Sequence, residues 1–246
     1  MLDPAVAALA FPVVMASVMG IAFTIAAMRG PAAQEAMASR GSVIYLAILI
    51  TYTTAAIGLV EPGAERLFAP VPDHLVQTLL LTGVGVAAGY SLLYLELELA
   101  LRLTRRRRDG GISSISAGGR GTQRAAAATA GRWFMLQAVL FAVFEELLWR
   151  GLGVREVQAQ YAGAEEAGII AAGVVLFGAC HFYFGLRAVF TKSICGLAWT
   201  GLTVLALGII PALASHIAYQ VAVARWNRRS EERRGRVPAG LGATPA

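Results

Sequence analysis

Residues 133–150 read WFMLQAVLFAVFEELLWR, an apolar run about as long as a bilayer crossing that ends in two glutamates and an arginine. An α-helix needs about 20 apolar residues to cross the roughly 30 Å of hydrocarbon in a bilayer. A charged side chain inside that layer costs about 2.5–3.5 kcal/mol on insertion scales. The run therefore predicts a membrane helix whose charges either form a functional site or reach the interface at an ordinary helix end.

The rest of the chain is equally apolar. Of its 246 residues, 57% are hydrophobic and 15% are charged, whereas soluble domains carry about 25% charged residues. Seven apolar segments meet or approach the length of a span, namely 4–28, 42–60, 75–101, 133–149, 168–185, 188–207 and 211–226. The predicted fold class is all-α, a polytopic transmembrane helix bundle of about seven spans.

The arginines predict the orientation of the bundle. They gather around the first connection, in residues 102–124 and in the tail after residue 225, while the second and fourth connections are not rich in Lys or Arg. The positive-inside rule then places the N-terminus outside and the C-terminus in the cytoplasm. Topology and anionic lipid account for the net charge of +6, so no nucleic-acid partner is expected.

Composition divides the chain into four parts. Residues 1–102 hold the first three spans, residues 103–131 form a flexible basic cytoplasmic loop, residues 132–226 form a helical core, and residues 227–246 form a basic, disordered tail. No basic region precedes the first apolar stretch, which therefore predicts a retained span rather than a cleaved signal. The two cysteines both lie in apolar stretches and predict no disulfide framework.

Helical geometry assigns the charged residues at the end of 133–150 to two different faces. Adjacent residues on an α-helix point about 100° apart, so Glu145 and Glu146 are not expected to share one role. Glu146 and Arg150 are spaced i, i+4 in the order that favours an intrahelical ion pair. Glu145 then lacks a local partner, and a carboxylate in an apolar setting is a candidate general base.

Two histidines also lie in apolar segments. His181 ends the segment FGACH at 177–181, and His216 opens HIAYQ at 216–220. A lone buried histidine is more often structural than catalytic, but two of them beside a glutamate pair inside a membrane favour a site.

The depth of these residues provides a geometric test. If the fourth helix continues to Gln160 and turns at 161–163, an antiparallel hairpin brings Glu145 and His181 to similar depth. His216 reaches that depth only if the sixth helix is tilted, short or broken. The possible break points are Gly196, Gly201 and Gly208.

Together these segments resemble the signature motifs of the CPBP family (CAAX proteases and bacteriocin-processing enzymes). The EExxxR motif matches at 145–150 and the FxxxH motif matches at 177–181. The third motif, usually HxxxN, matches at His216 but has Gln220 in place of asparagine. The resemblance covers residues 133–226, and the first three spans are similar only in being hydrophobic.

The resemblance implies a glutamate-type intramembrane endopeptidase. Glu145, assisted by His181, would activate a water, while His216 and Gln220 would stabilise the oxyanion. Glu146 and Arg150 would support the site structurally, and Phe177 would pack beside it. Gln220 offers the same amide donors as asparagine on a stem one methylene longer, so the oxyanion role either survives with a shifted pose or is lost.

Two other chemistries fit some of these residues. Cys180 precedes His181, but neighbours on a helix diverge and an apolar setting makes a thiol inert, so a structural cysteine is favoured over a nucleophile. Glu145, His181 and His216 are three residue types that ligate zinc. No HExxH motif is present and the family is generally viewed as metal-independent, so neither a metal nor a cofactor is expected.

The expected substrate is a membrane-anchored protein or peptide cut near a terminus. Prenylated CAAX proteins, bacteriocin precursors and C-terminal sorting tails are precedents in the family. The Ala-, Gly- and Arg-rich usage is typical of a GC-rich bacterial genome, which favours sorting or maturation in a bacterial inner membrane. The alternatives are a non-catalytic relative that binds a peptide or partner, and a transporter with a Glu/His proton relay.

Overall fold

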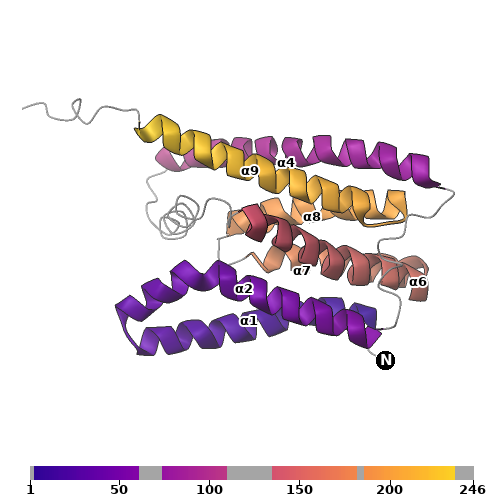
Figure 1. Cartoon of the computed structure of the whole chain (residues 1–246), viewed down its shortest axis with the longest axis horizontal. Helices are drawn as coiled ribbons and strands as arrows, with labels where there is room; N and C mark the ends of the chain where they lie inside the picture. Colours follow the sequence, from indigo (N-terminus) through magenta and orange to yellow (C-terminus); the bar gives the residue numbers. More distant parts are fainter. Residues whose placement is uncertain (1–2, 61–73, 110–134, 182–185, 236–246) are drawn as a thin grey trace, which may run out of the picture.

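The chain folds as a bundle of helices in the computed structural model, which describes residues 3–60, 74–109, 135–181 and 186–235 (Figure 1). Within these ranges there are no strands, and the helices form seven continuous segments when 135–160 is counted as one. Residues 135–146 are α-helical and continue directly into η2 and α6. The labelled helices are α1 (Pro4–Met28), α2 (Pro31–Val60), α4 (Leu75–Asp109), η2 (Leu147–Glu156), α6 (Val157–Gln160), α7 (Gly163–Ala179), α8 (Leu186–Ala206) and α9 (Ile210–Gly235).

Three of these helices have stretches long and apolar enough to cross a membrane, judged by length and composition over the described residues: Val6–Ala26, Leu75–Glu98 and Ala188–Ala206. Val43–Leu59 is a shorter apolar helix. Large apolar side chains are exposed along α1 and α4, as expected where a helix faces lipid. The predicted all-α membrane bundle is confirmed.

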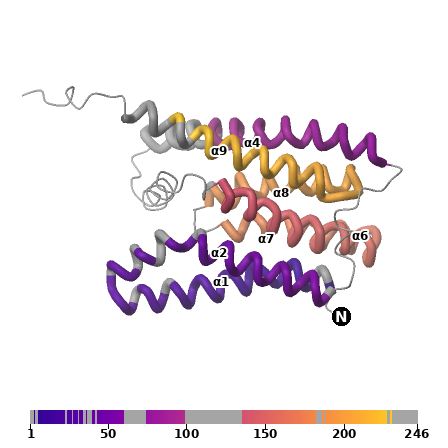
Figure 2. Tube along the Cα trace, in the orientation of Figure 1, coloured from indigo at the N-terminus to yellow at the C-terminus, as the bar shows by residue number. Residues whose placement is uncertain are grey.

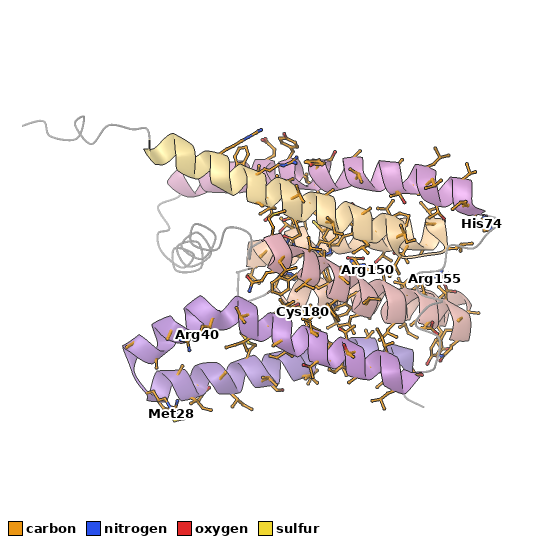
Figure 3. The ribbon with its side chains drawn as sticks, viewed as in Figure 1. Met28, Arg40, His74, Arg150, Arg155 and Cys180 are labelled. Carbon is orange, nitrogen blue, oxygen red and sulfur yellow. The ribbon has the colours of Figure 1, made fainter. Side chains whose placement is uncertain are left out.

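The helices form two outer pairs with the remaining segments between them. In Figure 1, α4 lies with α9 at one side of the bundle and α1 with α2 at the other, and Figure 2 shows the same order along the Cα trace. The helix of residues 135–160, α7 and α8 lie between the two pairs. Figure 3 places Met28 and Arg40 toward one end of the bundle and His74 and Arg155 toward the other, with Arg150 and Cys180 between them.

The predicted hairpin is present. The helix that carries the two glutamates ends at Gln160, and α7 begins at Gly163, so the chain turns at 161–163 as expected. The guanidinium of Arg150 lies 4.5 Å from the centroid of the Phe177 ring across this hairpin. Phe177 is one helical turn before His181, so the hairpin brings the EExxxR and FxxxH segments to the same level of the bundle.

Two expected boundaries differ from the structure. α4 continues to Asp109 and α9 to Gly235, so residues 103–109 and 227–235 are helical rather than a flexible loop and a disordered tail. Arginine is a good helix former, and each basic stretch simply prolongs the helix before it. Residues 110–131 of the expected loop and 236–246 of the expected tail lie outside the described residues.

The depth of His216 is set by the tight turn between α8 and α9, and α8 itself is neither short nor broken, since it has 21 residues. α8 passes through Gly196 and Gly201 without a break and ends at Ala206, and α9 already begins at Ile210. His216 therefore lies in the second turn of α9 and returns to the level of Trp199, on which its ring stacks.

The α4–α9 pair depends on two glycines spaced as GxxxG. A Cβ built on Gly85 would lie 2.5 Å from the carbonyl oxygen of Pro211, and one on Gly89 would lie 2.1 Å from that of Ser215. Small residues at this spacing let membrane helices approach closely and gain van der Waals contact. Because Ser215 precedes His216, this approach also fixes where His216 stands in the bundle.

We predict that Gly89→Ala lowers the free energy of unfolding in detergent by about 1–3 kcal/mol, because the added methyl group meets backbone rather than a mobile side chain. Gly83→Ala on the same helix is the control, since no atom lies within 4 Å of its added Cβ. It is expected to leave stability unchanged or to raise it by up to about 1 kcal/mol. Equal effects of the two substitutions would contradict the close approach.

Candidate active site

Glu146 is the centre of a buried polar cluster. Its side chain is 0% exposed, and its Oε1 lies 2.8 Å from Nδ1 of His216 and 3.4 Å from Nη1 of Arg150. The predicted i, i+4 ion pair with Arg150 is therefore present. A carboxylate can only accept, so Nδ1 of His216 carries the proton in this contact.

Arg150 links this cluster to two other helices. Its Nη2 donates to the carbonyl oxygen of Gly196 at 3.0 Å, and its guanidinium lies 4.5 Å from the Phe177 ring and 5.4 Å from the Trp199 ring. A Cβ on Gly196 would lie 2.8 Å from Phe177 and 3.3 Å from Nη2 of Arg150. Glycine is thus required where the guanidinium meets α8, and the two aromatic rings add cation–π stabilisation.

His216 is held by a stacking contact on its ring and by polar contacts at both nitrogens. Its ring stacks on Trp199 with centroids 3.8 Å apart and an interplanar angle of 19°, while Nε1 of Trp199 donates to Oγ of Ser215 at 3.1 Å. Its Nε2 lies 3.7 Å from Oε2 of Glu145 and 3.4 Å from Nε2 of Gln220. The ring has one position, with Nδ1 toward Glu146 and Nε2 toward the two other polar groups.

Glu145 and Glu146 have His216 as a common neighbour, and their other partners differ. Its Oε1 accepts a hydrogen bond from the Tyr45 hydroxyl at 3.1 Å, and its Oε2 faces His216. The two carboxylates were expected to act separately because they diverge on the helix. Their separate roles stay a prediction, and the structure adds that His216 approaches from α9 and lies near both carboxylates.

His181 lies at the end of α7 beside Phe177. Its Nδ1 is 3.0 Å from the carbonyl oxygen of Phe177, and the two rings are 5.3 Å apart with an interplanar angle of 62°. A carbonyl only accepts, so this contact assigns the proton to Nδ1 and the lone pair to Nε2. The contacts described for His181 attach it to Phe177, whereas those of Glu145 go to Tyr45 and His216.

A second, part-buried polar cluster joins α8, α9 and α4 beside His216. Nζ of Lys192 donates to the Tyr219 hydroxyl at 2.8 Å and lies 4.2 Å from the centroid of its ring. The Tyr219 hydroxyl in turn donates to Oε2 of Glu96 on α4. The cluster ties three helices together beside His216 and Gln220, because Tyr219 lies between those two residues in the sequence.

Sequence reasoning missed Tyr45, Trp199 and Lys192 as neighbours of the site. Lys192 had a usable signal, since a lysine within a predicted span is a functional candidate by default. The two aromatic residues had none, because tyrosine and tryptophan are common in membrane helices and their partners come from distant helices.

The backbone around the cluster is unusual. Residues Leu147–Glu156 form a π-helix that begins directly after the glutamates and contains Arg150. π-Helical segments are rare and are frequently found at functional sites. Within the described residues, Oε2 of Glu146 and both Nε and Nη1 of Arg150 have no hydrogen-bond partner, so the cluster retains hydrogen-bonding capacity in a buried place.

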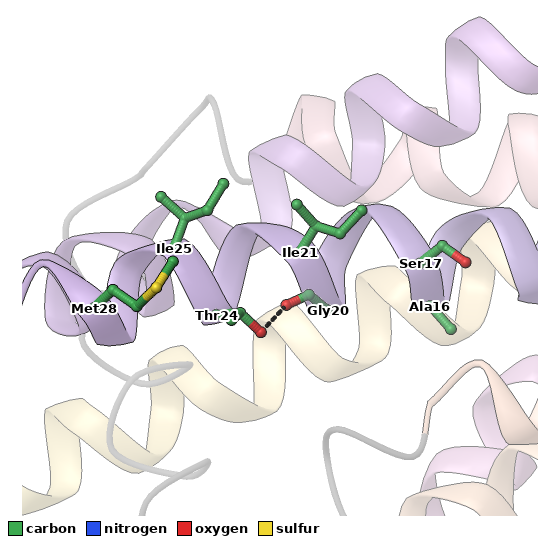
Figure 4. A pocket seen from close by; sticks show the side chains of 7 residues that line it. All are labelled: Ala16, Ser17, Gly20, Ile21, Thr24, Ile25 and Met28. Atoms are coloured by element: carbon green, nitrogen blue, oxygen red, sulfur yellow. Dashed lines mark hydrogen bonds between the residues drawn. The ribbon is translucent and has the colours of Figure 1, made fainter.

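Other features of the structure do not form a comparable site. Among the described residues, no three His, Cys, Asp or Glu side chains lie in a metal-binding arrangement. Cys180 and Cys195 are free and buried. The hollow in Figure 4 lies on α1 alone, between Ala16 and Met28, and its lining is small or apolar apart from Ser17 and Thr24. Its polar contact, Thr24 to the carbonyl oxygen of Gly20, lies within the helix.

We predict that Arg150→Met lowers the free energy of unfolding by about 3–5 kcal/mol, because it leaves the Glu146 carboxylate buried and uncompensated. The control is Arg155→Met on the same helix, whose guanidinium donates to Gln158 in a less buried position. Adding Glu146→Gln to Arg150→Met is expected to restore part of the loss, as measured by thermal unfolding in detergent. Equal stability of the two arginine variants would contradict the assigned role of Arg150.

One family model matches part of the chain. Residues 128–222 match the family model described as Type II CAAX prenyl endopeptidase Rce1-like. The match contains the glutamates, both histidines and Gln220, but not Tyr45. Comparisons with curated proteins and with solved structures gave no match. Residues 128–222 are therefore similar to the Rce1-like type II CAAX prenyl endopeptidases, which is consistent with the CPBP family.

Proposed function

We propose that this chain is an intramembrane endopeptidase in which Glu145 activates the attacking water. The family supports intramembrane endopeptidase activity in general. The glutamate mechanism rests on one observation, which is the meeting of Glu145, His216 and Gln220 around one point. Oε2 of Glu145 lies 3.7 Å from Nε2 of His216, which in turn lies 3.4 Å from Nε2 of Gln220.

The 3.7 Å between Oε2 of Glu145 and Nε2 of His216 is too long for a hydrogen bond, so the two atoms are not hydrogen-bonded to each other. With Nδ1 directed at Glu146, Nε2 of His216 is the ring nitrogen that would donate to an oxyanion, which requires a proton on both nitrogens. The amide of Gln220 presents further N–H groups beside it. Two donors at this spacing can both reach one oxygen atom, as an oxyanion site requires. This geometry supports retention of the oxyanion role by glutamine.

The proposed reaction is hydrolysis of a peptide bond through a tetrahedral intermediate. Glu145 takes a proton from water, and the water oxygen forms a bond to the carbonyl carbon of the scissile peptide. The carbonyl oxygen becomes an oxyanion that accepts hydrogen bonds from His216 and Gln220. Collapse of the tetrahedral intermediate breaks the C–N bond, and the proton held by Glu145 passes to the leaving amine. Glu146 and Arg150 hold His216 and the helix in place throughout.

We assign His181 to orienting the attacking water. Its contact with the carbonyl of Phe177 places the proton on Nδ1, so Nε2 has the lone pair needed to accept from a water hydrogen. The hairpin places His181 at the level of the glutamates. It thereby acts together with Glu145 on the water rather than on the oxyanion.

The proposed substrate is a membrane-anchored protein or peptide cleaved near a terminus in sorting or maturation. We place the chain in a bacterial inner membrane with its N-terminus outside and its C-terminus cytoplasmic. Residues 1–102 contribute helices around a catalytic core at 132–226. The arginine distribution supports this orientation, and the family match supports a membrane-anchored substrate.

A non-catalytic binding role is the second candidate, and one observation favours it. Glu145 is 5% exposed and His216 is 1% exposed, so the cluster is closed in this structure. A protease must separate helices to admit a peptide, whereas a protein that only binds a partner on its surface need not. Activity of site variants distinguishes the two.

We predict that Glu145→Gln abolishes processing of the substrate, with a loss of about 10²–10⁴-fold in rate, because the amide cannot accept the proton of water. Terminal processing of membrane-anchored proteins would be compared in cells carrying wild-type chain, Glu145→Gln or His181→Ala at matched abundance. A substrate that accumulates uncut with both variants is the expected result.

Glu98→Gln is the control for this experiment, since it removes a carboxylate from an exposed position on α4. It is expected to leave processing unchanged. If every protein is processed identically with wild type and both site variants, while another phenotype still depends on the chain, the binding role replaces the catalytic one.

The role of Gln220 is tested separately. Gln220→Leu is expected to lower kcat by about 10²–10³-fold, the usual cost of removing an oxyanion donor. Gln220→Asn keeps the amide on a shorter stem and is expected to retain more activity than the leucine variant. Equal activity of wild type and Gln220→Leu would remove Gln220 from the mechanism.

A further inference from the structure

We infer that Tyr45 is a positioning residue for Glu145, supplied by the α1–α2 hairpin outside the residues that match the family. The inference rests on the proposed catalytic role of Glu145 and adds to it a residue from another part of the chain. Tyr45 is in α2, 100 residues before the carboxylate to which its hydroxyl donates.

The hydrogen bond from Tyr45 gives the two carboxylate oxygens of Glu145 different surroundings. Oε1 accepts from the Tyr45 hydroxyl at 3.1 Å, and Oε2 faces Nε2 of His216. With Oε1 engaged, the oxygen that takes the proton from water is Oε2, on the side of the oxyanion donors. Tyr45 therefore selects the rotamer of Glu145 and the oxygen that reacts.

The tyrosine ring itself is fixed by aromatic neighbours. It lies 6.2 Å from Phe11 with an interplanar angle of 75°, and 5.5 Å from Phe141 at 34°. These contacts hold the ring with or without its hydroxyl group. Replacement by phenylalanine therefore removes the hydrogen bond and keeps the packing.

The same helix supplies a matched comparison. Tyr52, two turns further along α2, donates to the carbonyl oxygen of Ala7 at 2.6 Å and lies 5.2 Å from the same Phe11 ring. Its hydrogen bond joins α2 to α1 and has no contact with the glutamates. Tyr52→Phe thus removes a comparable hydrogen bond from the same hairpin without touching Glu145.

The test compares Tyr45→Phe with Tyr52→Phe in the full-length chain, using the substrate identified by terminal processing. Tyr45→Phe is expected to lower kcat about 10–100-fold, the range for loss of a hydrogen bond to a charged group, with KM unchanged. Tyr52→Phe is expected to leave both constants within about twofold. An unchanged kcat for Tyr45→Phe, or equal losses for both variants, would overturn the inference.

A double variant separates positioning from general packing. Glu145→Asp withdraws the carboxylate from Tyr45, so adding Tyr45→Phe should then change the residual kcat by less than about twofold. The same 10–100-fold loss in both backgrounds would show that Tyr45 acts independently of Glu145, contrary to the inference.

An infrared measurement in lipid vesicles needs no substrate. At a pH low enough to protonate Glu145, its C=O stretching band is identified by its loss in Glu145→Gln. Tyr45→Phe should shift this band to higher wavenumber, because the carbonyl loses a hydrogen bond, and Tyr52→Phe should not. A band that does not shift in Tyr45→Phe would show that the Tyr45 hydroxyl does not donate to Glu145, contrary to the inference. A shifted band without any cleavage leaves the contact in place and instead rejects the proposed function.

Discussion

A carboxylate buried away from water is tolerated only when it is compensated, and Glu146 is the buried group on which the other site residues depend. Its Oε1 is shared by Arg150 and His216. Arg150 then has to reach Gly196, which brings α8 against the glutamate helix, and His216 has to stack on Trp199, which brings α9 against α8. The compensation of one buried charge thus fixes the glutamate helix, α8 and α9 relative to one another, and Glu145 lies beside this cluster.

Under the proposed mechanism, one glutamate holds the helices in place and the other reacts. Glu146 and Arg150 are nearly inaccessible and make strong contacts with protein, while Glu145 has one hydrogen bond and one longer approach to His216. The outer helix pairs contribute from both sides. Tyr45 reaches the site from α2, and Glu96 holds Tyr219 from α4. The segment that matches the family is therefore completed by helices outside the match.

Residues spaced along one helix were the most predictable from sequence. The i, i+4 pairing of Glu146 with Arg150 and the turn at 161–163 follow from helix geometry, and both are present. The contact of His216 with both glutamates was not predictable, because it depends on how far α9 returns alongside α8. Tyr45 was missed because a tyrosine in an apolar helix carries no sign of its partner. The helical ends of α4 and α9 were not predicted, because arginine-rich composition is compatible with both a loop and the end of a helix.

The π-helix at Leu147–Glu156 has a consequence for how this region tolerates changes in chain length. A π-helical turn is closed by i→i+5 hydrogen bonds and holds one residue more than an α turn, so a return to α winding can absorb a one-residue deletion after Arg150. A deletion between Glu146 and Arg150 would instead change their spacing from i, i+4 to i, i+3 and displace the guanidinium from the carboxylate. The spacing of these two charges therefore limits changes in chain length more strictly than the winding that follows them.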